Sequence, residues 1–209
     1  MDERKWLRLF FLTPVLCLPA LAQNQIVVWS ATGTYDVSQT PRTVILTSAG
    51  TFKMKATDPG GPQGFGVIES ITVAEGVTGT VELYVVDEYG GPGADRVGWI
   101  NLMNATEGNV ARLYAYRYLG PDPENPDPGV EPTYVNAVTG LFHSGWFCKD
   151  VHVQSLSATG QIDTGTLYGD VFIEGAGPHQ GAIRILYPEA HNLAVAGTME
   201  GVIDLGNEH

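Results

Sequence analysis

The sequence is poor in basic residues, in cysteine and in charged residues as a whole. Its 209 residues include 11 Lys and Arg against 23 Asp and Glu, which gives a net charge of −12. Because proteins bind nucleic acid mostly through Lys and Arg, this balance argues against a nucleic-acid partner, and equally against an anionic membrane surface. Hydrophobic residues still make up 44% of the chain, which is enough for a core and excludes a wholly disordered protein. The length predicts one domain or two small ones.

The N-terminal segment has no apolar run long enough to cross a bilayer. Met1–Arg8 is net positive, and the apolar stretch Leu9–Leu18 that follows is short and contains a proline. Ala20–Ala22 then places small residues where a signal peptidase reads. Residues 1–22 are therefore predicted to be a secretory signal peptide that is cleaved before Gln23. The mature protein is expected to be secreted or on the cell surface, with no membrane span.

The predicted signal peptide decides which of the two cysteines the mature chain keeps. Cys17 leaves with the signal peptide, so the mature chain keeps Cys148 alone and forms no internal disulfide. Cys148 stands between aromatic residues, and we interpret it as a thiol packed in the core.

A glycine-punctuated repeat runs along the rest of the chain. Each copy is an apolar-x-apolar triplet, a short spacer and then Gly-x-Val or Gly-x-Ile, and the last three copies recur every 20 to 22 residues. The copies are Ile71–Val73 with Gly79–Val81, Ile100–Leu102 with Gly108–Val110, Val151–Val153 with Gly160–Ile162, Val171–Ile173 with Gly181–Ile183, and Leu193–Val195 with Gly201–Ile203.

The repeat predicts an all-β fold in which each copy supplies two short strands. A period near 20 residues is typical of a parallel β-solenoid, here of about five coils, since stacked copies bury a face that one copy leaves open. Ile162, Ile183 and Ile203 are then expected to stack inward, and the residues after the Gly-x-Val or Gly-x-Ile motifs to align outward: Glu82, Ala111, Asp163, Arg184 and Asp204. The alternative is an antiparallel β-sandwich or jelly roll, which also has short strands and Gly-rich turns.

The domain organisation follows the repeat. Residues 23–60 are predicted to be an N-terminal β capping segment, which covers the open edge of the first coil. Residues 61–209 are predicted to form the repeat domain, with inserts at 87–97 and 118–137 where the spacing lengthens.

The sequence contains no recognisable catalytic, phosphate-binding or dinucleotide-binding motif, so no catalytic, cofactor or metal residue is assigned. Asp150, Asp163 and Asp170 stand near strand ends, with nothing to distinguish an acid from a base. The acidic insert 120–131 carries carboxylates of the kind that calcium prefers. We interpret it as a solvated, Pro-rich loop, and a weak calcium site is the alternative.

Tyrosines supply the candidate ligand site. In Leu113–Tyr118 the alternation places Tyr114, Tyr116 and Tyr118 on one strand face. Such a face is either a hydrophobic cover for the large insert or a platform on which sugar rings stack, because tyrosine combines an apolar ring with a polar tip.

Over about residues 66–205 the Gly-x-Ile copies make the chain resemble the secreted, Gly-rich parallel β-helix repeat proteins of bacterial surfaces, of the planctomycete type. Some relatives of that fold are polysaccharide lyases with calcium-binding Asp clusters and a catalytic Arg or Lys, and no arginine here stands with such a cluster. The resemblance implies an exported, non-enzymatic structural or adhesive surface module, whose partners are surface polysaccharide or other surface proteins. The alternatives are a carbohydrate-binding module with a tyrosine platform and a polysaccharide-active enzyme.

Overall fold

The structure is a computed structural model that describes residues 25–36, 42–57, 64–188 and 191–206. The predicted signal peptide, 1–22, lies outside these residues. The described residues form strands and turns, with no helix among them. The strands are β1 (Gln25–Trp29), β2 (Gly33–Asp36), β3 (Arg42–Leu46), β4 (Gly50–Lys55), β5 (Val67–Val73), β6 (Thr80–Val85), β7 (Ala94–Asn101), β8 (Glu107–Leu119), β9 (Thr133–Phe147), β10 (Val151–Leu156), β11 (Gln161–Leu167), β12 (Val171–Ile173), β13 (Ala182–Tyr187), β14 (Leu193–Val195) and β15 (Val202–Leu205).

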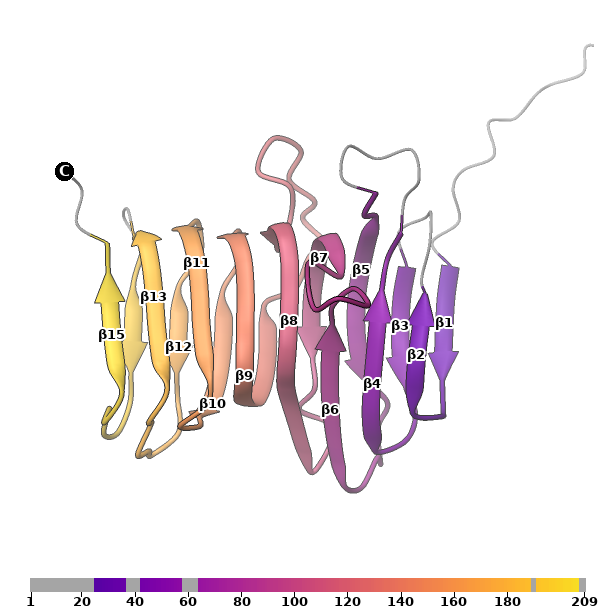
Figure 1. Ribbon diagram of the computed structural model, residues 1–209, viewed down its shortest axis with the longest axis horizontal. Helices are drawn as coiled ribbons and strands as arrows, with labels where there is room; N and C mark the ends of the chain where they lie inside the picture. Colours follow the sequence, from indigo (N-terminus) through magenta and orange to yellow (C-terminus); the bar gives the residue numbers. More distant parts are fainter. Residues whose placement is uncertain (1–24, 37–41, 58–63, 189–190, 207–209) are drawn as a thin grey trace, which may run out of the picture.

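The strands lie in two rows that face each other along the molecule (Figure 1). The first row contains β1, β3, β5, β7, the first half of β9, β10, β12 and β14. The second row contains β2, β4, β6, β8, the second half of β9, β11, β13 and β15. Every pairing between these named strands is parallel, so the chain is an all-β protein with a curled parallel sheet, and the antiparallel alternative is wrong.

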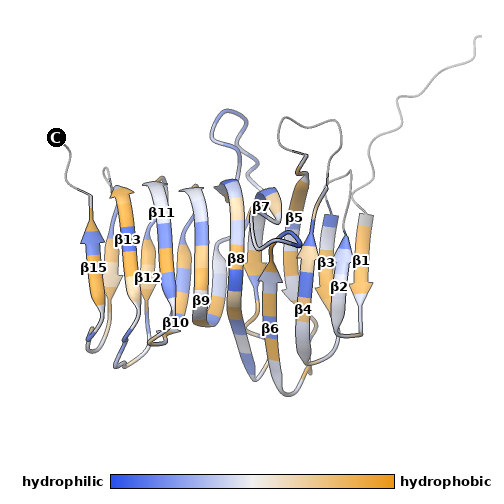
Figure 2. Cartoon of the chain, viewed as in Figure 1, coloured by the Kyte–Doolittle hydropathy of each residue, from blue (hydrophilic) through white to orange (hydrophobic). Residues whose placement is uncertain are grey.

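The core lies between the two rows. Along the second row one inward position pairs without a break across neighbouring strands, through Met54, Val85, Leu113, Phe142, Ile162, Ile183 and Ile203. These side chains are fully buried as far as Ile183, which confirms the predicted isoleucine stack, whereas Ile203 at the end of the row is 43% exposed. Hydropathy alternates along the strands in the same way (Figure 2), as expected when one face is buried.

The glycines of the Gly-x-Ile copies stand where successive strands of the second row begin. A Cβ added at Gly201 would collide with the carbonyl oxygen of Gly181, and one added at Gly181 would collide with that of Gly160. Gly160 stands in the same relation to the carbonyl oxygen of Val138. The motif therefore requires glycine because the backbones approach too closely for a side chain.

The outward charges align only in the C-terminal half of the chain. Asp163 lies opposite Arg184, and Arg184 lies opposite Asp204, as predicted. The prediction for Glu82 and Ala111 is wrong, because Glu82 lies opposite Asn109. The earlier copies pair two residues out of the predicted register. A shift of two residues keeps each side chain on its own face of the sheet, so hydrophobic alternation does not distinguish the two registers.

The predicted capping segment and inserts have the following positions. Residues 23–60 supply β1 to β4, which pair within the same two rows as the later strands. The predicted insert 87–97 contains a turn and the start of β7, and the predicted insert 118–137 contains the end of β8, a loop and the start of β9.

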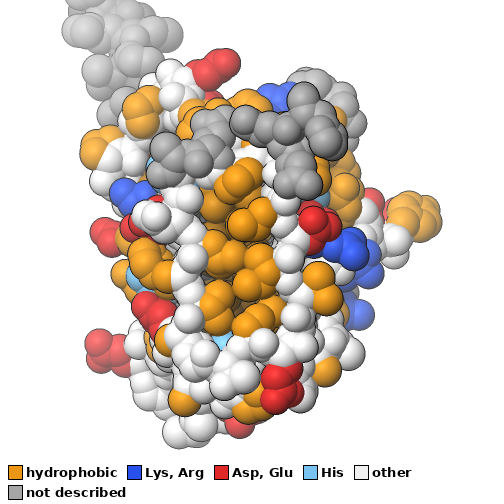
Figure 3. All heavy atoms as spheres, turned by 90° about the vertical axis from the view of Figure 1, so that its left-hand side faces the viewer, with side chains coloured by type: hydrophobic (Ala, Val, Ile, Leu, Met, Phe, Trp, Pro, Cys, Tyr) orange, Lys and Arg blue, Asp and Glu red, His pale blue; other side chains and the backbone are white. Residues whose placement is uncertain are grey.

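The end of the molecule formed by β14 and β15 shows its interior. In Figure 3, which looks onto this end, apolar side chains fill the space between two rims of polar atoms and backbone. A cavity of about 450 Å³ lies there and is lined by Leu193, Val195, Ile203 and Leu205, among others. The apolar filling of the rows therefore extends to the last strands.

Candidate functional site

Two cavities lie on the outer face of the second row. One, which we call the tyrosine cleft, has a volume of about 520 Å³ and is lined by Tyr114, Tyr116, Arg117, Tyr118, His143, Gly145 and Trp146. The other, the basic groove, has a volume of about 460 Å³ and is lined by residues of β2, β4, β6 and β8 and of the turn after β6. Both volumes are in the range of small-molecule sites.

The structure brings the three predicted tyrosines together in the tyrosine cleft. They come from β8, and aromatic residues of β9 complete the lining: the Tyr114 ring lies edge-on to His143, with centroids 4.5 Å apart, and the Tyr118 ring lies 5.1 Å from Trp146. Tyr116 is 40% exposed and Trp146 is 37% exposed. The cleft therefore offers apolar ring faces and hydroxyl tips to solvent, a combination that suits the mixed polarity of a sugar ring.

A β-bulge shapes the cleft. Ala115 pairs with Ser144 and Tyr118 pairs with Trp146, so β8 has one more residue than β9 over this stretch. Bulges redirect side chains, which places Tyr116 and Arg117 on the outside one after the other. Gly145 lies against this bulge, where an added Cβ would lie 3.0 Å from the carbonyl oxygens of both Tyr116 and Arg117.

Charged partners hold the polar groups of the cleft. His143 Nδ1 lies 3.5 Å from Asp163 Oδ2, and Arg117 Nε lies 3.4 Å from Asp95 Oδ1. Burial raises the pKa of the Asp95 carboxyl, while the Arg117 guanidinium opposes that rise. Burial, and after it the Asp122 carboxylate, raises the pKa of the Tyr118 hydroxyl above its ordinary value, so this hydroxyl stays protonated and able to donate at neutral pH.

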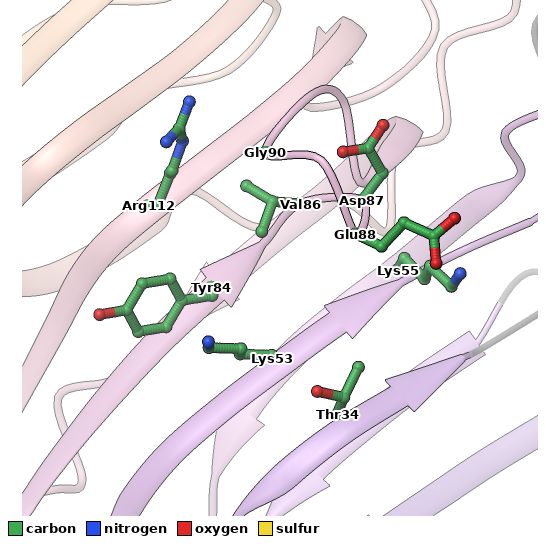
Figure 4. Close-up of a pocket in the computed structure, with 9 residues that line it drawn as sticks. All are labelled: Thr34, Lys53, Lys55, Tyr84, Val86, Asp87, Glu88, Gly90 and Arg112. Atoms are coloured by element: carbon green, nitrogen blue, oxygen red, sulfur yellow. The ribbon is translucent and has the colours of Figure 1, made fainter.

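The basic groove is built from one outward position on four neighbouring strands. Thr34 pairs with Lys53, Lys53 with Tyr84, and Tyr84 with Arg112. The Lys53 ammonium lies 5.4 Å from the centre of the Tyr84 ring (Figure 4), within the range of a cation–π contact. The Tyr84 ring is therefore set between two basic side chains from the strands on either side of it.

The turn after β6 closes one side of the basic groove. Asp87 Oδ1 accepts hydrogen bonds from the backbone N–H groups of Tyr89, at 2.9 Å, and of Gly91, at 2.6 Å. Lys55 Nζ lies 4.0 Å from Asp36 Oδ2. On this side of the groove, Asp87 thus stabilises the turn and Asp36 forms an ion pair with Lys55.

The two cavities adjoin across β8. Arg112 lines the basic groove and Tyr114 lines the tyrosine cleft. Each of the two lies opposite an outward residue of β9, Arg112 opposite Leu141 and Tyr114 opposite His143. Since side chains two residues apart on a strand point to the same side, the two cavities form one continuous surface.

The other candidate positions serve the fold locally. Asp122 Oδ1 accepts from the backbone N–H of Glu124, and Asp127 Oδ1 accepts from that of Gly129, so these two of the four carboxylates of the acidic insert cap their own turns. No group of three or more His, Cys, Asp or Glu side chains suited to a metal ion occurs in the described part of the chain. The calcium site therefore stays a prediction.

Two of the carboxylates near strand ends hold successive corners together. Asp150 Oδ1 accepts from the backbone N–H of Asp170, and Asp170 Oδ1 accepts from that of Asn192, each at 2.9 Å. The hydrogen bonds from the backbone and side chain of Asn192 lower the pKa of Asp170. Cys148 is buried, as predicted, and burial raises the pKa of its thiol to about 12, so it stays protonated.

Several residues of the two cavities were not predicted as ligand residues. His143 and Trp146 belong to Gly140-Leu141-Phe142 and its continuation, a copy of the repeat that pairs with Gln161 and Ile162 of the next strand. Lys53, Tyr84 and Arg112 do not become neighbours when the copies are aligned by their glycines, because Lys53 lies opposite Tyr84 and not opposite Glu82. The Gly-x-apolar spacing is thus a signal for His143 and Trp146, whereas the residues of the basic groove carry no such signal.

No family model matches the chain, and the comparisons with curated proteins and with solved structures gave no significant match either. The described residues include no helix that is long and apolar enough to cross a membrane.

Proposed function

We propose that this protein is an exported, non-enzymatic adhesive module of the cell surface that binds carbohydrate in the tyrosine cleft. The observation that carries the proposal is the gathering of Tyr114, Tyr116, Tyr118 and Trp146 around one open cavity. Exposed aromatic rings on a rigid sheet cost little conformational entropy on binding, and tyrosine supplies both an apolar face and a hydroxyl.

We further propose that the two rows are faces of a β-solenoid, an architecture that suits this function. The two parallel rows, the inward ladder and the glycines at the corners are what a chain wound into stacked coils requires. β1 to β4 and β9 also belong to the rows, so the proposed solenoid includes strands beyond the five predicted copies. A stiff rod that presents side chains on its outer face suits a surface module that holds an extended ligand.

The test is saturable binding to glycans. We expect the full chain to bind at least one member of a polysaccharide array, and Tyr114→Ala and Tyr116→Ala to weaken that binding about fivefold or more, since aromatic contacts are each worth roughly 1 kcal/mol. Tyr89→Ala is the matched control, because Tyr89 is 89% exposed and lies outside the cleft. Absence of binding across the array, or equal loss with the control, contradicts the proposal.

One further measurement separates the binding module from the enzyme, and a second tests secretion. Release of reducing ends or unsaturated products from a bound polysaccharide would favour the polysaccharide-active enzyme over a binding module. Mass spectrometry of the exported protein is expected to find Gln23 as its first residue, and an intact Met1 on an exported chain would contradict secretion by signal cleavage.

A further inference from the structure

The basic groove is built from side chains that are scarce in this protein. The whole chain has 11 Lys and Arg, yet Lys53, Lys55 and Arg112 all line one cavity, whose acidic lining residues are Asp87 and Glu88 of the turn after β6. Among the described residues, neither Lys53 nor Arg112 has a carboxylate within ion-pair distance, whereas Lys55 lies 4.0 Å from Asp36. In a chain with a net charge of −12, two exposed cations beside one aromatic ring offer an anionic ligand a place to bind.

Resting on the function proposed above, we propose that the carbohydrate is an anionic polysaccharide, which lies across the strands and places an acidic group in the basic groove. Lys53 and Arg112 stand on strands that flank that of Tyr84, so they are about 10 Å apart at the usual strand spacing. A sugar ring over Tyr84 would have a cation on each side of it. The next rings of the chain would reach Tyr114 and His143, which follow Arg112 on the same surface.

The sparse charge of an acidic polysaccharide fits this surface better than nucleic acid does. A nucleic acid carries a phosphate on every nucleotide and needs many cations along its path. Here Lys53 and Arg112 flank a single ring, Arg117 of the tyrosine cleft lies 3.4 Å from Asp95, and the net negative charge of the protein repels a dense polyanion. A glycan with one carboxylate or sulfate per repeat would meet the cations at one place and aromatic rings at the next.

The experiment compares ligands that differ only in charge. Calorimetry would measure the affinity of the full chain for hyaluronan oligosaccharides, which carry one carboxylate per disaccharide, and for the same oligosaccharides with their carboxyls methyl-esterified. It would also compare κ-carrageenan oligosaccharides, which carry one sulfate per disaccharide, with the same oligosaccharides after desulfation. We expect the acidic member of at least one pair to bind several-fold more tightly at low salt, with the difference shrinking in about 1 M NaCl because the Debye length falls to about 3 Å. The pair that shows the difference identifies the group as carboxylate or sulfate.

Charge-neutralising variants locate the effect. Lys53→Gln and Arg112→Gln are each expected to weaken binding of the acidic ligand about two- to fivefold and to leave the neutral ligand unchanged. Arg184→Gln is the matched control, since Arg184 is exposed on the same outer row, lies away from the groove and makes the same change in charge. Circular dichroism melts of all three variants check that they fold.

The outcomes distinguish the inference from the function on which it rests. If acidic and neutral ligands bind equally while Tyr114→Ala still weakens both, the inference is wrong and the carbohydrate function stands. If no polysaccharide binds, both the inference and the proposed carbohydrate function are wrong. If single-stranded DNA of the same length binds more tightly than the acidic glycans and loses affinity in Lys53→Gln and Arg112→Gln, the groove is a nucleic-acid site and the inference is overturned.

Discussion

At the scale of single residues, close backbone approach decides where this chain tolerates a side chain. Gly181→Ala is expected to lower the free energy of unfolding by about 1–3 kcal/mol, because the new Cβ would collide with the Gly160 carbonyl and would lie 2.6 Å from that of Ser157. Urea denaturation measures the change. Gln180→Ala, at the exposed preceding position, serves as the control and should stay within about 0.5 kcal/mol of the parent. If Gly181→Ala is as stable as the parent, the backbone at this corner moves to make room for the Cβ and the prediction is wrong.

The sequence pattern reveals the glycines at the strand corners but not the glycine in the tyrosine cleft. Gly160, Gly181 and Gly201 each precede a buried or core-facing isoleucine by two residues, so the spacing alone marks them as corners. Gly145 faces a bulge in a different strand. A bulge depends on how two strands pair, which no local pattern records, so the shape of the tyrosine cleft could not be predicted although its three tyrosines were.

At the scale of strands, the two-residue period of hydrophobicity predicts which face of the sheet a side chain occupies more reliably than it predicts which residue of the next strand it pairs with. Ile162, Ile183 and Ile203 stack as expected, and the middle residue of the triplet at His152 points outward, where its ring stacks between Tyr134 and Phe172 at centroid distances of 4.6 and 4.7 Å. The N-terminal copies pair two residues away from the predicted register. Strand faces follow from hydrophobicity, whereas register also depends on turn length and bulges, so the basic groove was missed.

The inward ladder carries a prediction about β13. Ile183→Asp would bury a charge between Ile162 and Ile203, with no partner on the ladder. We expect the free energy of unfolding to fall by at least about 3 kcal/mol and the melting transition to broaden or to shift sharply downward. Arg184→Gln, one residue along on the outer face, should change stability by no more than about 1 kcal/mol. A cooperative melt of Ile183→Asp near the parent temperature would contradict the role of this ladder.

At the scale of the whole molecule, each strand pair is stabilised mainly by its immediate neighbours. The molecule is elongated, with β1 and β15 at opposite ends (Figure 1), and strands far apart along it are not paired. In such a quasi-one-dimensional protein an inner strand has neighbours on both sides, whereas an end strand has one. The position of a strand along the axis should therefore set its stability more than its composition does.

Native-state hydrogen exchange is the measurement that tests this view. The inward residues Phe142, Ile162 and Ile183 are fully buried, while Ile203 and Leu205 of β15, the last strand of the second row, are 43% and 44% exposed. We expect amides of β14 and β15 to exchange through local opening at free energies well below that of global unfolding, and amides of β9 and β11 to exchange last. Protection should rise from β15 through β13 to β11, because each strand removed exposes the next. Equal protection of β15 and β9 would contradict this gradient and would mean that the end strands are held as firmly as the middle of the molecule.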